Sequence, residues 1–536
     1  METKKVKLTV NGLGIEVVAG TSVFEAAAKV GIVIPHYCYH PDLSVAGVCR
    51  MCTVEIEKLP RLQISCNTPV AEGMVVRSDT EKVQDAVKNV LELHLINHPI
   101  DCPICDKAGE CKLQDYYAKY GLYQSRMEYD KVHKPKAVDI GTIVLDEERC
   151  ILCTRCVRFT AEVTKTNELG IFNRGDRSEL RTFDGGPLHN DYTGNLADIC
   201  PVGALTAKDF RFRQRVWFLE RTDSVCGQCA HGCNTSLSVN PNTKKLFRVE
   251  PRRNPEVNKS WICDLGRWEF HYIHAEDRVQ TPLKRIGGAM QEVTWHEVFG
   301  DLKAKVVAAP DRVFVGLSTH LTCEEMADAF ATFGALGVKK FGRIVDENAV
   351  EDKQPFDSIL KHRDLTPNAE GFVRVAKACG VSWLTTKEVS ALGQQGMLDW
   401  IFLLGLEGHA MPGAALFLSS RKGKEKIVIH ATNLSPLCEV AEYVVPNVSQ
   451  YEKRGTFVNA QGRAQKVNPA VPGQFTARDA HAVVFGITRG NDRDVLPVAQ
   501  AQKIFESVIA PKVFRQEKAR FRKFEPLGIL LEGVGR

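Results

Sequence analysis

The sequence contains no run of about 20 apolar residues, so we expect no transmembrane helix in this chain. Its first residues, Met-Glu-Thr-Lys-Lys-Val, lack the apolar core of a signal peptide. The net charge is only +5, from 70 Lys and Arg residues against 65 Asp and Glu residues, which predicts no nucleic-acid partner. We find no nucleophile–base pair, no carboxylate dyad and no phosphate-binding glycine loop, so we expect no catalytic residue and no NADH or flavin site.

Cysteine, in contrast, is abundant. Eighteen cysteines without a secretion signal favour a reducing compartment and metal or cluster ligation over disulfides. Fifteen of them precede residue 264, and the remaining three, Cys323, Cys379 and Cys438, are interpreted as core thiols. A chain of 536 residues is long enough for about three to four domains.

The first 80 residues predict a small ferredoxin-like domain. Residues 5–10 alternate as a half-buried strand, Asn11-Gly12 indicates a hairpin, and residues 14–18 form the return strand. Ser22 and Glu25 form a capping box for a short helix, and this order is similar to the ubiquitin-like β-grasp fold of ferredoxins. Four thiols then suit a [2Fe–2S] cluster, with zinc or free thiols as the alternative: Cys38, Cys49, Cys52 and Cys66.

A second set of ligands joins one imidazole to three thiols. A helix predicted over residues 81–97 leads to His98, and Gly109 allows the chain to turn before the last thiol. The set suits a [4Fe–4S] cluster, and a structural zinc site uses the same residue types: His98, Cys102, Cys105 and Cys111. A neutral imidazole in place of a thiolate should raise the reduction potential. His94, one turn earlier, is interpreted as a packed or surface histidine.

Two further sets of four thiols follow. A C-x2-C-x2-C run with a remote fourth cysteine predicts one [4Fe–4S] cluster, held by Cys150, Cys153, Cys156 and Cys200. Arg155 and Arg158, beside this run, either offset cluster charge or are solvated surface residues. The last set predicts one more [4Fe–4S] cluster, with a zinc ribbon as the alternative: Cys226, Cys229, Cys233 and Cys263.

Residues 98–114, 149–159 and 198–206 carry specific motifs, and the chain as far as residue 263 closely resembles a known family. This is the large iron–sulfur subunit of bacterial respiratory complex I, the NuoG-like or 75 kDa subunit family of NADH:quinone oxidoreductase. The resemblance implies an NADH- and FMN-binding partner, transfer through the [2Fe–2S], Cys150 and His98 clusters, and quinone-side iron–sulfur partners. It also implies that the Cys226 cluster lies off this path, and that the chain is peripheral on the cytoplasmic side of the inner membrane, held there only through partner subunits.

The C-terminal half has a different character. Short apolar runs alternate with helical stretches from about residue 276, which predicts an α/β region with a mostly parallel sheet. Residues 280–298 and 451–463 resemble the molybdopterin oxidoreductase fold, and active enzymes of that type have far more chain after the fourth cysteine. We therefore expect a truncated domain that binds no molybdopterin. The basic segment 512–523 is either a docking tail for an acidic partner subunit or a solvated end.

The predicted protein is a multidomain α+β and α/β electron-transfer subunit of NADH:quinone oxidoreductase, a respiratory-chain translocase. One alternative is an iron–sulfur subunit of a soluble NAD-linked or electron-bifurcating hydrogenase or formate dehydrogenase complex, and another is a zinc scaffold without redox activity. The predicted domains are the [2Fe–2S] ferredoxin-like domain 1–80, the His/Cys-ligated [4Fe–4S] domain 81–120, the ferredoxin-like [4Fe–4S] domain 121–215, the [4Fe–4S] domain 216–275, the molybdopterin oxidoreductase-like domain 276–505 and the basic tail 506–536.

Overall fold

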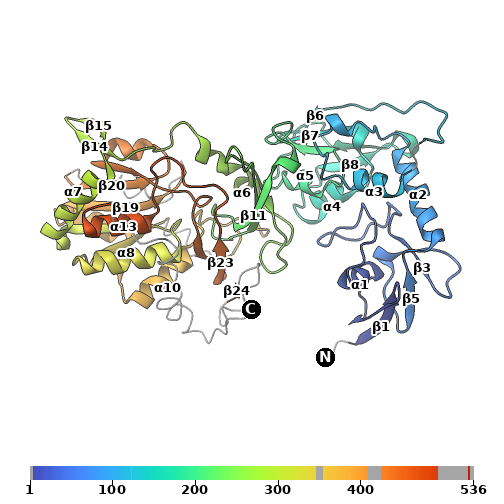
Figure 1. Ribbon diagram of the computed structural model, residues 1–536, viewed down its shortest axis with the longest axis horizontal. Coiled ribbons are helices and arrows are strands. Elements are labelled where there is room, and N and C mark those ends of the chain that lie inside the picture. The colour runs from blue at the N-terminus through green and yellow to red at the C-terminus, as the bar shows by residue number, and fades with distance from the viewer. Residues whose placement is uncertain (1–3, 122–123, 346–353, 409–423, 493–528, 531–536) are drawn as a thin grey trace. The chain divides into compact units, whose positions relative to one another are not determined.

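The computed structural model describes residues 4–121, 124–345, 354–408, 424–492 and 529–530. The chain divides into two compact units, Met1–Phe218 and Leu219–Arg536 (Figure 1). Most of the predicted basic tail, residues 506–536, lies outside the described residues. Among the helices that are described, none is both long and apolar enough to cross a membrane.

The first unit begins with the predicted β-grasp domain. Strands β1 (Lys5–Val10) and β2 (Leu13–Val18) form an antiparallel hairpin, and Asn11 and Gly12 at its turn have φ values of 48° and 82°. Helix α1 (Val23–Lys29) begins with the predicted capping box of Ser22 and Glu25. The sheet order is β2-β1-β5-β3-β4, completed by β3 (Thr53–Ile56), β4 (Gln63–Ile64) and β5 (Met74–Arg77).

Two helices connect this domain to the second part of the first unit. Helix α2 (Glu81–Leu95) buries Val83, Val87 and Leu91, close to the predicted range, and α3 (Lys112–Tyr120) follows the short 3₁₀ turn Cys102–Ile104. The second part is built from β6 (Val138–Asp139), β7 (Ile143–Leu145), α4 (Arg155–Glu162), β8 (Leu169–Phe172), β9 (Glu179–Thr182), α5 (Asn195–Ile199) and β10 (Leu205–Ala207). Strands β10, β7 and β6 form one small sheet, and β8 pairs with β9.

The second unit begins with an antiparallel sheet of β11 (Glu220–Val225), β12 (Asn234–Val239) and β13 (Leu246–Pro251), followed by α6 (Asp264–Trp268). Cys226 directly follows β11 and Cys233 directly precedes β12. The end of one strand and the start of the next therefore place two of the predicted ligands at the same edge of this sheet. The backbone N–H of Cys226 donates to the carbonyl of Cys233 at 2.8 Å, which fixes that arrangement.

An eight-stranded sheet forms the core of the second unit, in the order β15-β14-β21-β20-β19-β16-β17-β18. Strands β14 (Leu283–Ile286) and β15 (Ala289–Glu292) are antiparallel at one edge, and the other six are mutually parallel. These six are β16 (Val313–Ser318), β17 (Lys340–Ile344), β18 (Trp383–Leu384), β19 (Trp400–Leu406), β20 (Lys426–Ala431) and β21 (Tyr443–Pro446). The predicted mostly parallel sheet is confirmed.

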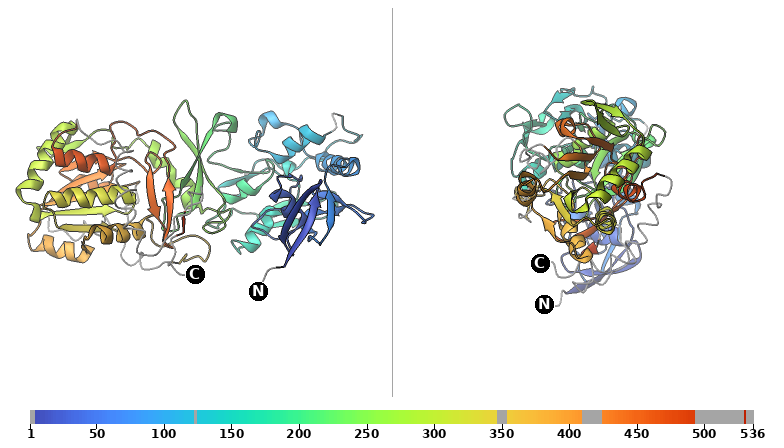
Figure 2. Two further views of the ribbon diagram at one scale, coloured as in Figure 1. Left: turned by 60° about the horizontal axis from the view of Figure 1, so that its bottom comes forward. Right: turned by 90° about the vertical axis from the view of Figure 1, so that its left-hand side faces the viewer.

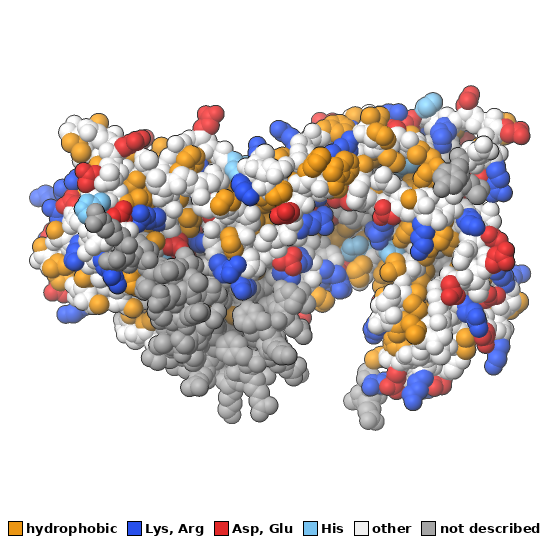
Figure 3. All heavy atoms as spheres, in the orientation of Figure 1, with side chains coloured by type: hydrophobic (Ala, Val, Ile, Leu, Met, Phe, Trp, Pro, Cys, Tyr) orange, Lys and Arg blue, Asp and Glu red, His pale blue; other side chains and the backbone are white. Residues whose placement is uncertain are grey.

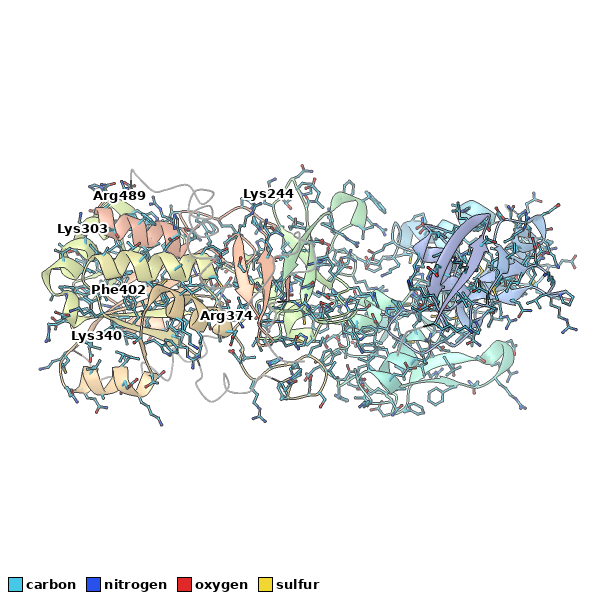
Figure 4. The ribbon with its side chains drawn as sticks, turned by 90° about the horizontal axis from the view of Figure 1, so that it is seen from below. Lys244, Lys303, Lys340, Arg374, Phe402 and Arg489 are labelled. Carbon is cyan, nitrogen blue, oxygen red and sulfur yellow. The ribbon has the colours of Figure 1, made fainter. Side chains whose placement is uncertain are left out.

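Helices cover both faces of this sheet (Figures 1 and 2). One face packs against α7 (Trp295–Ala308), α8 (Cys323–Ala335), α10 (Ala369–Cys379) and α13 (Ala480–Arg489), and the other against α11 (Thr386–Gln394). Alternate residues of each strand face opposite layers, as in Phe402 and Leu403 of β19. Phe402, labelled in Figure 4, belongs to the core between the sheet and the helices of the first face. The same view labels Lys303 and Arg489, and the Lys303 side chain donates to the Arg489 carbonyl at 3.1 Å.

A small sheet of β22 (Gly455–Val458), β23 (Arg463–Val467) and β24 (Ile529–Leu530) completes the second unit. On the surface that Figure 3 shows, charged side chains of both signs are interspersed with apolar ones. This mixture agrees with the small net charge of the sequence.

Candidate iron–sulfur sites

The four thiols of the first set lie together: Cys38, Cys49 and Cys52 come from the loop between α1 and β3, and Cys66 comes from the 3₁₀ turn after β4. All four are buried, and hydrogen bonds join the thiol of Cys38 to that of Cys49 and the thiol of Cys52 to that of Cys66. The bond from Cys49 lowers the pKa of Cys38, and the bond to Cys52 together with burial raises the pKa of Cys66. The backbone N–H of Tyr37 donates to Cys49 Sγ at 3.4 Å. This set of thiols with main-chain donors fits a cluster ligand shell.

Gly47 allows a tight turn in the chain just before Cys49. Its φ is +65°, a conformation that disfavours other residues, and a Cβ there would lie 3.1 Å from Ile64 Cδ1. His94, predicted to be a packed or surface residue, is half-buried and contacts this loop rather than the second set. Its Nε2 lies 3.2 Å from the Cys49 carbonyl, and its ring meets the edge of Tyr37 with 5.0 Å between centroids.

The second set surrounds one pocket. His98, Cys102, Cys105 and Cys111 all line it, together with Asp101 and Gly203. Burial and the nearby Arg149 cation lower the pKa of His98 to about 4, so its imidazole is neutral at ordinary pH. The Nδ1 atom of His98 is buried and has no hydrogen-bond partner in the described part of the chain. A neutral ring with an unpaired nitrogen fits the ligand role that the sequence predicts.

Gly203 shows how closely the third set approaches this pocket. A Cβ at Gly203 would lie 2.3 Å from Cys105 Sγ, so no larger residue fits without a shift. The backbone N–H of Lys112 also donates to the Pro201 carbonyl at 3.1 Å. The residues that directly follow Cys111 and Cys200 are therefore in contact, although they are far apart in the sequence.

The third set is assembled by a strained turn and a remote helix. Leu152 lies between Cys150 and Cys153, and Thr154 lies between Cys153 and Cys156. Their φ values of 54° and 61° are in the left-handed region. The Leu152 N–H donates to Cys150 Sγ at 3.4 Å, and Cys200 arrives at the end of α5. Burial raises the pKa of Cys156 first, and the neighbouring thiols Cys153, Cys150 and Cys200 raise it further. The four cysteines therefore lie close together, and three of them are buried while Cys150 is half-buried.

The fourth set lies at the edge of the antiparallel sheet in the second unit. Burial and the neighbouring thiols Cys226, Cys229 and Cys263 raise the pKa of Cys233. The Gly266 N–H donates to Cys263 Sγ at 3.4 Å, and a Cβ at Gly266 would lie 2.9 Å from Cys226 Sγ. The first turn of α6 thus approaches two sulfurs at once, which the sequence spacing did not reveal.

Basic side chains near the thiols are held by specific contacts. Arg155, which the sequence left as either charge-compensating or solvated, is only 6% exposed. Arg149 forms ion pairs with Asp101 at 2.7 Å and with Asp146 at 2.8 Å, and it lies beside His98. The sequence motif alone gave Arg149 no role. The available signals were the acidic residues 146–148 directly before it and Asp101 directly before Cys102.

In the described residues, no group of three or more His, Cys, Asp and Glu side chains is arranged to hold a single metal ion. The ligand assignments above therefore remain predictions, supported by the buried thiols, the main-chain donors and the close glycines. The three other cysteines are separate from these sets. Cys323, for example, begins α8 in the core with its Sγ 3.6 Å from Asn368 Oδ1.

A cavity lies near the C-terminal ends of the parallel strands, where a phosphate-bearing cofactor could bind. It is lined by Gln228, Leu265, Glu269, Tyr272, His320, Leu365, Glu407, Gly408 and Gln450. Burial raises the pKa of Glu407, and the lining contains no Lys or Arg. The lining offers neutral donors, but it has no cation to balance a phosphate and it includes the carboxyl groups of Glu269 and Glu407, so it does not fit the charge of a molybdopterin phosphate.

Five family models match consecutive parts of the chain. They are the 2Fe-2S iron-sulfur cluster binding domain (3–81), the NADH-ubiquinone oxidoreductase-G iron-sulfur binding region (88–126), the NADH-quinone oxidoreductase subunit 3 ferredoxin-like domain (141–206), the NADH-ubiquinone oxidoreductase NDSU1/NuoG-like 4Fe-4S domain (219–271) and molybdopterin oxidoreductase (384–488). The chain therefore contains 2Fe–2S and 4Fe–4S domains and a molybdopterin oxidoreductase-like region, which confirms the predicted fold class.

Individual relatives agree with these models. The NADH-quinone oxidoreductase G subunit of Streptomyces coelicolor is 39% identical over 351 residues, 65% of this chain and 40% of that protein. The mitochondrial NADH-ubiquinone oxidoreductase 78 kDa subunit of Candida albicans is 40% identical over 304 residues, 56% of this chain and 42% of that protein. The chain spans less than half the length of the curated relatives it matches. A chain of an NAD+-reducing [NiFe]-hydrogenase in the H2-reduced state is 32% identical, with 39% of this chain and 91% of that chain covered and a TM-score of 0.37.

Proposed function

Because the iron–sulfur region of this chain, residues 3–271, belongs to the NuoG-like family of NADH-quinone oxidoreductase subunits, we propose that the chain relays electrons in such a complex. In this proposal an NADH- and FMN-binding subunit supplies the electrons and quinone-side iron–sulfur subunits receive them. The chain would then be peripheral, on the cytoplasmic side of the bacterial inner membrane and attached through its partners. Its domains would follow the limits predicted from the sequence.

We propose one [2Fe–2S] and three [4Fe–4S] clusters on the four sets of ligands. Once bound, each cluster takes up and releases a single electron. The chain supplies the ligands, excludes water and donates main-chain hydrogen bonds to sulfur, which together set the reduction potentials. His98 supplies a neutral donor, so its cluster carries less negative charge than one with four thiolates. No molybdopterin is included in this proposal.

Contacts within the first unit carry the relay proposal. Arg158 donates to the carbonyl of Cys38 at 2.6 Å and lies 3.4 Å from that of Cys153, so the first and third sets adjoin. Gly203 lies against Cys105, so the third and second sets adjoin as well. The order Cys38, Cys150 and His98 sets is therefore a series of neighbours. The Cys226 set belongs to the other compact unit, and its place off this route rests on the family resemblance.

Metal and sulfide analysis of the full chain, purified anaerobically, tests the cofactor assignment. The proposal expects about 14 iron atoms per chain, matched sulfide and little zinc. Low-temperature EPR after reduction should show one binuclear and several tetranuclear signals. A colourless, zinc-loaded protein would instead support the zinc scaffold and overturn the proposal.

A reduction assay tests the assignment to the complex. NADH alone should leave the clusters oxidised, and NADH with the flavin subunit of the same complex should reduce them. A matched control uses the flavin-bearing subunit of a soluble NAD-linked hydrogenase. If the hydrogenase flavin subunit reduced the clusters and the complex I flavin subunit did not, the assignment would be overturned and the hydrogenase alternative favoured.

A further inference from the structure

Helix α4 carries three polar side chains toward the loop of the first ligand set. Arg155, Arg158 and Glu162 are spaced three and four residues apart, so they lie along one face of the helix. The same helix contains Cys156, a predicted ligand of the third set. One helix therefore connects two predicted clusters.

Arg158 contacts the backbone of both sets. Its Nη2 donates to the Cys38 carbonyl at 2.6 Å and lies 3.4 Å from the Cys153 carbonyl, while its Nη1 donates to the Ser44 carbonyl. The two carbonyls belong to ligands of different predicted clusters. A single planar guanidinium thus forms a short hydrogen-bonded bridge between them.

Arg155 and Glu162 complete the clamp. Arg155 Nη1 donates to the Ile199 carbonyl at 3.0 Å, beside Cys200, and its Nη2 donates to the Tyr39 carbonyl, beside Cys38. Glu162 accepts from the Ser44 backbone N–H at 2.8 Å and from the Ser44 hydroxyl. Together the three side chains hold the loop 38–44 against α4.

The charges of the two arginines act on the sulfurs at short range. The acceptors of Arg155 are main-chain carbonyls rather than carboxylates, and its side chain is buried, so its field is weakly screened. The Arg158 guanidinium lies close to both sets, because it donates to the carbonyls of Cys38 and Cys153. A positive charge close to the ligands favours a reduced cluster, which carries one more negative charge.

We propose that Arg158, assisted by Arg155, is a positioning residue for electron transfer between the Cys38 and Cys150 clusters. It fixes the separation of the two ligand loops, and its charge raises both reduction potentials. The step is the movement of one electron from the reduced to the oxidised cluster, with no bond made or broken. This inference rests on the proposed function, because it requires both clusters.

Three variants of the anaerobically purified full chain test the proposal: Arg158→Gln, Arg158→Lys and the control Arg177→Gln, an exposed arginine of the same unit. Iron content is measured first, and an EPR redox titration then gives each potential. Arg158→Gln should lower the reduced-to-oxidised ratio of the Cys38 and Cys150 clusters about tenfold at a fixed potential, a shift of about 59 mV. The His98 and Cys226 clusters and the Arg177→Gln protein should be unchanged.

Arg158→Lys separates charge from geometry. Lysine keeps the positive charge and cannot make the planar two-pronged contact, so both potentials should stay while electron exchange between the two clusters slows. Freeze-quench EPR after rapid chemical reduction measures this exchange. Unchanged potentials in iron-replete Arg158→Gln, or an unchanged rate in Arg158→Lys, would overturn the proposal.

Failure of the wider function gives a different result, because the wild-type chain itself would then either lack iron or stay oxidised with NADH and the flavin subunit of the complex. If the Arg158→Gln variant loses iron while the wild-type chain keeps it, the effect of charge on the two potentials is measured in Arg155→Gln instead. Ser44→Ala loosens the loop without a change of charge, so it should leave both potentials unaltered. A shift in Ser44→Ala equal to that in Arg155→Gln would attribute the effect to loop disorder and overturn the role of charge.

Discussion

Gly203 and Cys105 touch so closely that a Cβ on the glycine would lie 2.3 Å from the cysteine sulfur. Gly203 follows Cys200, a predicted ligand of one cluster, and Cys105 is a predicted ligand of another. The contact therefore joins two predicted cluster sites whose ligands come from two different predicted domains. It also makes one backbone position responsible for the shape of a neighbouring site.

Gly203→Ala should damage the His98 centre. The added methyl group overlaps Cys105 Sγ, and overpacking of this kind typically costs roughly 1–3 kcal/mol. We expect loss of the EPR signal of the His98 cluster, while the Cys38 signal remains. Gly14→Ala is the matched control, because a Cβ at Gly14 meets nothing within 4 Å. An intact His98 signal in Gly203→Ala would contradict this role of the glycine.

His98→Cys should lower the potential of one tetranuclear cluster. A thiolate adds negative charge where the imidazole, with its pKa lowered to about 4, is neutral. Redox titration monitored by EPR should show the shift in a single signal. His94→Gln is the control, because His94 contacts the Cys49 carbonyl and does not line the pocket of His98. A shift of two signals, or of none, would refute the assignment of His98.

Cys233→Ser should remove the Cys226 cluster alone. The iron content should fall from about 14 to about 10 atoms per chain, because one tetranuclear cluster is lost. The three clusters of the first unit should keep their signals and their reduction by the flavin subunit. Cys379→Ser, a half-buried cysteine outside the four sets, should retain all the iron. Loss of reduction in Cys233→Ser would place this cluster on the main route.

The second unit should lose stability as the pH falls from 6.5 to about 4. Burial lowers the pKa of His430 to about 4, whereas the same side chain in the unfolded chain titrates near 6.5. The unfolded state binds more protons in this window, so the free energy of unfolding decreases on acidification, by about 1.4 kcal/mol per pH unit for this group.

Urea unfolding, followed by tryptophan fluorescence at pH 7.5 and pH 5.5, measures this effect. His430→Gln keeps a donor for the Arg478 carbonyl, which His430 Nε2 contacts at 2.9 Å, and has no proton to gain. The loss of stability between the two pH values should therefore be smaller in the variant. Equal losses in both proteins would show that His430 is not the titrating group.

The sequence predicted the elements and ligand sets that depend on local pattern. Asn11-Gly12 predicted the first hairpin because type I′ turns need positive φ at both positions. Alternating apolar runs predicted the strands of the second unit, and C-x2-C spacing predicted the ligand sets. Helix α2 ended at Leu95 rather than at residue 97, an error of the size expected for helix ends.

Contacts between distant segments were beyond sequence reasoning. Arg158 meets Cys38 across 120 positions of the chain, and nothing in either motif indicates the other. The same holds for strand order: β16 lies between β17 and β19, although periodicity gives each strand only a type and a range. Buried charge was missed for a related reason, because Arg155 in the sequence looks like any surface arginine until the packing around it is known.

The late position of Cys200 has a consequence for how the protein is made. Cys38, Cys49, Cys52 and Cys66 are all synthesised within the first domain, so their ligand shell is complete while most of the chain is still untranslated. The Cys150 set is complete only after α5 has been synthesised, and the wall of the His98 pocket is complete only after Gly203 has been synthesised. Ribosome-bound chains shorter than this point would offer the maturation machinery one finished binuclear site and two unfinished tetranuclear ones.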